Sequence, residues 1–120
     1  MSDINETVTR YLGIWNEQDP AIRRAAIEEV FSAGATYTDP LAAVAGHDAI
    51  DALVAAAQGQ FPGFTFRQLG TSDAHHDIVR FTWELGPAGV EAPVVGFDVA
   101  VIDSDGRIAS VYGFLDKVPA

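Results

Sequence analysis

The stretch Ala92-Pro93-Val94-Val95-Gly96-Phe97-Asp98-Val99-Ala100-Val101-Ile102 carries a single charged residue, Asp98, in an otherwise uncharged and mostly apolar run. A run of this kind, rich in valine, predicts a buried β-strand. An ionised carboxylate without a partner is so costly to bury that it usually takes up a proton, which raises its pKa. The neutral acid is then a hydrogen-bond donor, so Asp98 is the first candidate functional residue.

The side chains of this strand divide into two faces, because successive residues point to opposite sides of a sheet. If Asp98 points inward, its face also carries Gly96, Ala100 and Ile102. A contiguous apolar sheet surface on a soluble protein is typical of an interface, so we expect a homodimer that packs sheet against sheet. The opposite, outer face that would form this interface carries Val95, Phe97, Val99 and Val101.

Alternating patterns on both sides of this run predict further strands of the same sheet. They cover residues 64–69, 78–85 and 108–115, while the run itself covers 94–103. Turn-forming residues at 73–77, 86–89 and 103–106 lie between them and suit hairpin connections. The second half of the chain is therefore predicted to form four consecutive strands.

The first half of the chain predicts three helices and one short strand. The helices cover about 4–16, then 20 to about 31 with Asp19 as N-cap, and 47–58 after Gly46. The second helix is expected to close near 32–34, and residues 35–40 read as a strand stopped by proline. Together these elements predict an α+β fold in which helices pack on one face of a curved, mostly antiparallel sheet and enclose a pocket.

Composition limits the classes of partner. The chain has 120 residues, enough for one domain (1–120), and its net charge of −10 disfavours nucleic acid and membrane surfaces. The chain has no cysteine, which excludes disulfides and thiolate chemistry. The first six residues lack the pattern of an export signal. We therefore expect a cytoplasmic protein that binds a small apolar or carbonyl-containing molecule.

The order of elements, with an acid before proline in Thr38-Asp39-Pro40 at the end of the first strand, resembles the nuclear transport factor two-like superfamily over essentially the whole chain. Within it, SnoaL-like proteins, among them polyketide cyclases, and ketosteroid isomerases are most similar in pattern. Tyr11, Asp39 and Asp98 fall where ketosteroid isomerase carries its tyrosine, its base and its second aspartate. The resemblance implies a cone-shaped α+β roll and a cofactor-free isomerase or cyclase. Asp39 would move a proton next to a carbonyl, while Tyr11 and protonated Asp98 would donate to the enolate oxygen.

The residues alone leave other interpretations open. Asp39 stands at a semi-exposed strand end where a carboxylate is available as a base, but Asp-Pro is also a common turn. Tyr11 on the inner face of a helix is equally ordinary core material. A buried Asp98 could be satisfied by a neighbouring donor without any chemistry.

Bulky side chains are expected to shape the pocket and to disfavour a ligand as large as a steroid. Trp15 lies one helical turn beyond Tyr11, and Tyr37 shares a strand face with Asp39. His75 and His76, being adjacent, do not suggest a metal site, and no cofactor is expected. The predicted substrate-contacting residues are Trp15, Tyr37, Leu53, Phe61, Phe81, Trp83 and Leu115.

Three functions therefore remain: a proton-transferring isomerase or cyclase, a hydrolase or dehydratase in which the acids activate water, and a non-catalytic ligand-binding or dimerisation module. The two catalytic interpretations require the carboxyl groups of Asp39 and Asp98 to open into one cavity, whereas the non-catalytic one does not.

Overall fold

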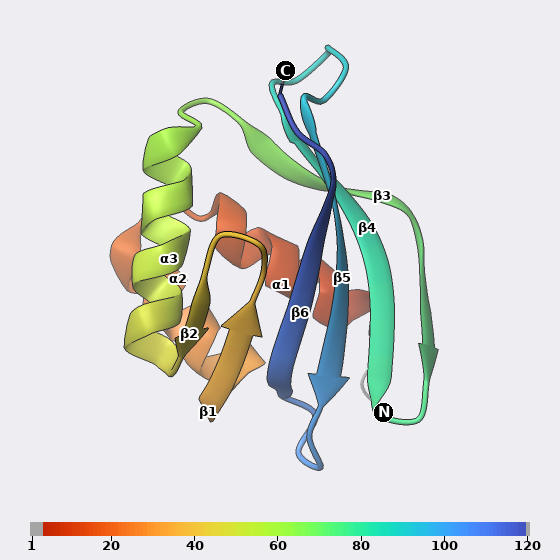
Figure 1. Cartoon of the computed structure of the whole chain (residues 1–120). Coiled ribbons are helices and arrows are strands. Elements are labelled where there is room, and N and C mark those ends of the chain that lie inside the picture. The colour runs from red at the N-terminus through yellow and green to blue at the C-terminus, as the bar shows by residue number, and fades with distance from the viewer. Residues whose placement is uncertain (1–3, 120) are drawn as a thin grey trace.

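The computed structural model describes residues 4–119, in which three helices pack against one six-stranded mixed sheet (Figure 1). Residues 1–3, part of the segment considered above for an export signal, lie outside the described residues. This arrangement confirms the predicted α+β class. In chain order the elements are α1 (Ile4–Asn16), α2 (Pro20–Val30), β1 (Phe31–Thr38), β2 (Ala43–Ala45), α3 (His47–Gln60), β3 (Thr65–His75), β4 (Ile78–Gly86), β5 (Val94–Ile102) and β6 (Ile108–Lys117).

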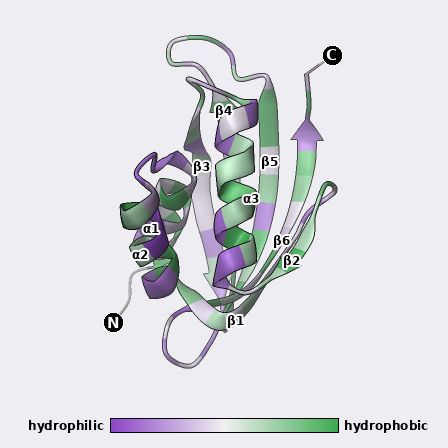
Figure 2. Cartoon of the chain, turned by 90° about the vertical axis from the view of Figure 1, so that its left-hand side faces the viewer, coloured by the Kyte–Doolittle hydropathy of each residue, from purple (hydrophilic) through white to green (hydrophobic). Residues whose placement is uncertain are grey.

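The strands follow the order β2-β1-β6-β5-β4-β3, and the sheet does not close into a barrel. Strands β3 to β6 form the predicted antiparallel meander, whereas β1 pairs with β6 in parallel. The helices gather on one side of the curved sheet, and α3 lies in front of the strands and runs roughly along them when viewed from that side (Figures 1 and 2). Because β1 and β6 are neighbours, the end of β1 lies beside the middle of β6.

The helix starts agree with the sequence signals. The side chain of Asp19 accepts hydrogen bonds from the backbone N–H groups of Ala21 (2.9 Å) and Ile22 (3.2 Å), as an N-cap does. Gly46 adopts a φ of 89° immediately before α3, a conformation that favours glycine. The prediction of a break at 32–34 was wrong, because the chain passes directly from α2 into β1 at the buried Phe31.

Two other strand boundaries differ from the prediction. Strand β2 was not predicted, because its short alanine-rich sequence forms a strand only by pairing with β1. Strand β3 continues to His75 instead of ending near Leu69, since a bulge with Gly70 at a φ of 77° carries the ladder past the irregular segment. The turn expected at 73–77 is therefore shorter.

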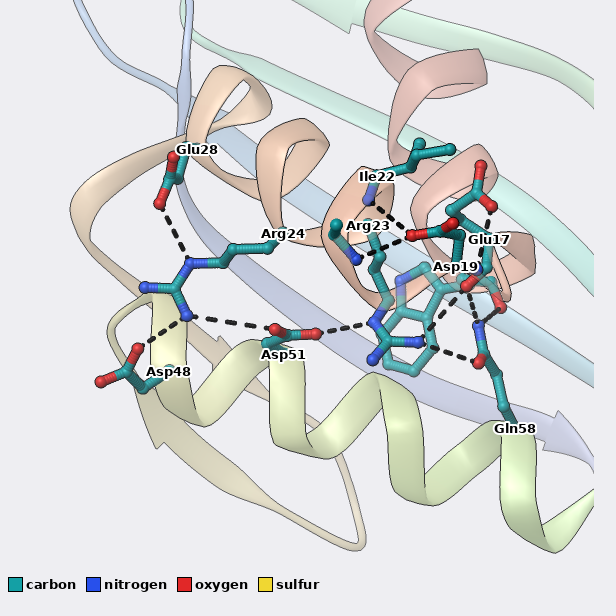
Figure 3. A network of polar contacts seen from close by, with 11 residues as sticks. Glu17, Asp19, Ile22, Arg23, Arg24, Glu28, Asp48, Asp51 and Gln58 are labelled. Atoms are coloured by element: carbon teal, nitrogen blue, oxygen red, sulfur yellow. Dashed lines mark hydrogen bonds and ion pairs between the residues drawn. The ribbon is translucent and has the colours of Figure 1, made fainter.

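A polar network ties α3 to the other helices (Figure 3). The buried Arg23 donates from Nε to Oδ1 of Asp51 (2.7 Å) and from Nη1 to Oε1 of Gln58 (3.1 Å). The amide of Gln58 in turn donates to the carbonyls of Trp15 (3.0 Å) and Glu17 (2.8 Å). These bonds fix α3 against the end of α1, which matters because both helices line the cavity described below.

The two faces of β5 are those predicted from its alternation. Gly96, Asp98 and Ala100 are buried on the inner face, whereas Val95, Phe97, Val99 and Val101 are half-buried on the outer one. The inner face joins α1 and α3 in a single apolar core. Across residues 4–119, no helix has the length and apolar character needed to cross a membrane.

Candidate functional site

A cavity of about 500 Å³ lies between the inner face of the sheet, α1 and the second half of α3. Such a volume suits a small organic molecule. Most of its wall is apolar or aromatic, and its two ionisable acids are Asp39 and Asp98. The lining residues with polar side-chain atoms are Tyr11, Trp15, Tyr37, Asp39, Gln60, Trp83 and Asp98.

Asp98 is 1% exposed, and its two carboxyl oxygens differ in their surroundings. The hydroxyl of Tyr11 donates a hydrogen bond to Oδ2 at 3.3 Å, whereas Oδ1 has no hydrogen-bond partner within the described part of the chain. Burial raises the pKa of Asp98 to about 7, although Trp83 and Tyr11 beside it act in the opposite direction. Near neutral pH, Asp98 therefore exists both as a neutral donor and as a carboxylate.

Tyr11 is held by aromatic packing. Its ring makes edge contacts with Phe31 and Phe81, with centroid distances of 5.9 and 5.6 Å. Burial first, and then the charge of Asp98, raise the pKa of Tyr11 well above its usual range, so its hydroxyl stays protonated. Phe81, predicted as a substrate contact, packs behind this ring and is not among the residues that line the cavity.

Asp39 follows the last residue of β1 and is half-buried. Its Oδ1 accepts hydrogen bonds from the backbone N–H groups of Leu41 (2.8 Å) and Ala42 (2.9 Å). Its Oδ2 accepts one from the hydroxyl of Tyr37, at 2.8 Å. The turn expected from Asp-Pro is therefore present, and it holds the carboxylate at the cavity with a fixed orientation.

The two acids meet above Gly113 on β6. A Cβ placed on Gly113 would lie 2.8 Å from Oδ1 of Asp98 and 3.3 Å from Cβ of Asp39. Asp98 is opposite Gly113 in the β5–β6 ladder, and the parallel pairing of Thr38 with Tyr112 brings Asp39 to the same place. The cavity therefore brings the predicted acids together, which the sequence could only suggest.

Aromatic rings form a continuous wall beside the acids. Trp15 contacts Tyr37 and Phe66 at centroid distances of 5.6 and 5.4 Å, and Phe66 contacts Trp83 at 5.3 Å. The indole of Trp83 lies directly over Gly96, where a Cβ would come within 2.0 Å of Cζ2. Both tryptophans of the chain thus line the cavity, and their fluorescence can report on its occupancy.

Six of the seven predicted contact residues line the cavity, namely Trp15, Tyr37, Leu53, Phe61, Trp83 and Leu115. Sequence reasoning missed the remaining lining residues, among them Phe66, Gln60 and Leu41. The alternation of Phe64 and Phe66 was a usable signal for the first of these, because it identifies an inward face of β3.

The histidines do not form a metal site. Within residues 4–119, no three His, Cys, Asp or Glu side chains are grouped to hold a metal ion. His75 and His76 are both exposed, and their ring centroids lie 6.1 Å apart. His47 is half-buried, with Nε2 placed 3.1 and 3.0 Å from the carbonyl oxygens of Phe31 and Ser32. It therefore ties the start of α3 to β1.

Residues 8–111 match the family model of the SnoaL-like domain. No curated protein matches the chain. Among solved structures, the chain is similar to a candidate isomerase of the SnoaL-like family from Agrobacterium tumefaciens, with 36% identity and a TM-score of 0.88. That match covers 92% of this chain and 95% of the other.

More distant structures share the fold. A candidate polyketide cyclase from Sinorhizobium meliloti is 22% identical with a TM-score of 0.71, over 90% of this chain and 93% of its own. A SnoaL-like protein of unknown function from Burkholderia thailandensis is 15% identical with a TM-score of 0.74, over 96% of this chain and 98% of its own.

Proposed function

This chain belongs to the SnoaL-like family of domains, and we propose that it is an isomerase or cyclase that moves a proton next to a carbonyl group within its cavity. The observation that carries the proposal is the convergence of two acids with unlike surroundings above Gly113. One is held in place by backbone N–H groups, and the other is buried with an unpaired oxygen. The comparison with a candidate isomerase that is 36% identical supports the same reaction class.

The two acids would act in sequence. Protonated Asp98 donates a hydrogen bond to the carbonyl oxygen of the substrate, and Tyr11 supports it through Oδ2. Asp39 removes a proton from the neighbouring carbon, so that the C–H electron pair forms the C=C bond of an enolate and the oxygen takes the charge. Asp39 then returns the proton to another carbon. In a cyclase the enolate carbon attacks a second carbonyl, and the proton goes to the new alkoxide.

The wall of the cavity supports a substrate with one carbonyl group and an otherwise apolar or aromatic body. No lysine, arginine or histidine is among the described residues that line it, so an anionic substrate would meet only carboxyl groups. The bulky indoles of Trp15 and Trp83 line the cavity, and we take this to favour a molecule smaller than a steroid.

Proton exchange on a small enolisable ketone tests this proposal. We expect the protein to speed the loss of the α-proton signals of indan-2-one in D₂O, followed by NMR. Asp39→Asn should lower the rate by at least about 100-fold, because general-base catalysis contributes on this scale. Asp77→Asn removes an equal charge from the exposed β3–β4 turn and serves as the control. Equal rates in wild type and Asp39→Asn would refute the proposal.

A reaction that activates water is the second candidate, because both acids line one cavity and lie near the same residue of β6, Gly113. It predicts turnover of an ester or epoxide without exchange on a ketone. A non-catalytic ligand-binding module would instead bind indan-2-one with no exchange and no hydrolysis. Ketone exchange therefore identifies the isomerase or cyclase, and turnover of an ester or epoxide separates the hydrolase from the binding module.

We also propose that the protein forms a homodimer through the outer face of the sheet. Tyr112 and Phe114 on β6 are 46% and 57% exposed. They pair in register with Val99 and Phe97 on β5, and the rings of Phe97 and Phe114 lie 6.5 Å apart. The surface formed by Val95, Phe97, Val99, Val101, Tyr112 and Phe114, here the outer patch, is too apolar to favour contact with water.

A further inference from the structure

The charged side chains of the described residues that line the cavity are all acidic, which affects the charge of the ligands that it can bind, whether or not the protein is an enzyme. These acids are Asp39 and Asp98, and the chain as a whole has a net charge of −10. A field of this sign attracts cations into an apolar enclosure and repels anions.

Oδ1 of Asp98 lacks a hydrogen-bond donor among the described residues, and a ligand could supply one. Oδ1 is buried and accepts no hydrogen bond in the described part of the chain, while Oδ2 accepts one from Tyr11. When Asp98 is ionised, a buried carboxylate oxygen without a donor is strongly unfavourable. A ligand that brings a positively charged N–H group would supply the donor and the countercharge together.

The aromatic wall suits the same kind of group. Trp15, Phe66, Trp83 and Tyr37 form consecutive ring contacts at 5.3 to 5.6 Å along the cavity. The negative faces of such rings attract ammonium groups, most strongly for tryptophan, and the attraction grows when the site is desolvated. Carboxylates and aromatic rings therefore select for the same ligand charge.

We propose that this cavity binds small lipophilic amines in their protonated form, with the ammonium group donating to Oδ1 of Asp98 beside the carboxylate of Asp39. The binding concerns a ligand class other than the carbonyl substrate and does not depend on catalysis. Both ligand classes would compete for the part of the cavity lined by Asp39 and Asp98. The amine requires the ionised form of Asp98, whereas the ketone requires the protonated form.

The pH dependence follows from the groups around Asp98. Tyr11 approaches it from α1, Tyr37 from β1 and Trp83 from β4. Asp39, which follows β1, is the second acid near it, and no lysine, arginine or histidine is among the described residues that line the cavity to compete with the amine for Asp98. With a pKa of about 7, Asp98 changes from mostly protonated to mostly ionised across neutrality. Amine affinity should therefore rise about tenfold between about pH 6 and about pH 8, while alkyl amines stay protonated throughout.

A pair of probes with one carbon skeleton tests the inference. Binding of 2-aminoindane and of indan-2-one to the full chain is measured by tryptophan fluorescence at both pH values. We expect the amine to bind more tightly at the higher pH and the ketone to bind no more tightly there. Asp98→Asn keeps a hydrogen-bond donor but cannot ionise. It should therefore remove the pH dependence of amine binding and lower the affinity for 2-aminoindane about tenfold at the higher pH, while the affinity for indan-2-one is retained.

Glu29→Gln, which removes an equal charge from an exposed position on α2, should leave amine binding unchanged. The inference is overturned if 2-aminoindane binds no better at the higher pH, or if Asp98→Asn leaves its affinity unchanged. A ketone that binds and exchanges while the amine fails would overturn this inference and leave the proposed reaction standing. An amine that binds with the predicted pH dependence, without ketone exchange, would support the inference and overturn the reaction.

Discussion

Oδ1 of Asp98 lies so close above Gly113 that a Cβ at position 113 would approach it to 2.8 Å. Gly113 has no positive φ, so its backbone conformation is open to other residues. Glycine is therefore needed at position 113 because a side chain would not fit there, and not because the backbone adopts a conformation that only glycine favours. The same Cβ would lie 3.3 Å from Cβ of Asp39.

Gly113→Ala is expected to separate the acids without unfolding the protein. The added methyl group must displace the carboxyl group of Asp98 or the end of β1, and such overpacking costs about 1 to 3 kcal/mol of stability. Affinity for indan-2-one should fall at least about tenfold, measured by tryptophan fluorescence beside a thermal unfolding curve. Gly34→Ala on β1, where a Cβ meets no atom within 4 Å, is the matched control. Unchanged affinity in Gly113→Ala would argue against the placement of the site.

Gly96→Ala is expected to act on a different group, the indole of Trp83. A Cβ at position 96 would overlap the ring, at 2.0 Å from Cζ2, so the indole must leave its place beside Asp98. We expect a loss of about 1 to 3 kcal/mol in urea unfolding and a changed near-ultraviolet signal from the tryptophan. In a Trp83→Leu background the same substitution should cost clearly less. Equal costs in the two backgrounds would show that the glycine serves another purpose.

Most of the fold could be predicted because its elements follow local patterns. The alternation around Asp98 predicts both faces of β5, and Asp19-Pro20 predicts the start of α2. The errors lie where a distant partner decides the conformation. Strand β2 exists only through β1, and β3 continues past Gly70 because β4 supplies the ladder on both sides of the bulge.

The candidate site shows the same limit. Sequence reasoning placed Asp39 and Asp98 in one pocket from a family resemblance, but not the surface on which they meet. A glycine inside a strand signals close approach by another group, yet Gly96 and Gly113 acquire partners only from the strand register. Phe81 was expected at the ligand because it shares a strand face with Trp83, although Tyr11 covers it.

Asp98 should make the stability of the fold depend on pH. Its pKa is about 7 in the folded protein against 3.8 ordinarily, so the folded state binds this proton more tightly than the unfolded chain. The stabilisation is complete below about pH 4, is lost as the pH rises to about 7 and then stays constant. Asp98→Asn lacks this titration, so its free energy of unfolding relative to wild type should rise by roughly 2 to 4 kcal/mol across that range.

Urea unfolding of both proteins at several pH values measures this difference. Comparing the two proteins cancels the contributions of other groups, which are the same in both. One of these is Asp103, whose lowered pKa of about 2 means that its contribution to stability is lost as the pH falls. A difference that does not change with pH would mean that Asp98 ionises in the folded state as it does in the unfolded chain.

Val99→Lys should disrupt the proposed dimer without affecting the cavity. The side chain of Val99 lies on the outer face of β5, opposite Tyr112 of β6, and points away from Asp98. A lysine there would place an unpaired ammonium group in the centre of the outer patch, and burying it against a second copy is unfavourable. Sedimentation velocity should show a dimer for wild type and a monomer for Val99→Lys. Ile22→Lys, at an apolar position of α2 that is 56% exposed, adds the same charge away from the sheet and should leave the dimer intact. A dimer that persists in Val99→Lys would contradict the proposed interface and leave this face exposed to solvent. If the Val99→Lys monomer binds indan-2-one as tightly as wild type does, one subunit holds a complete cavity.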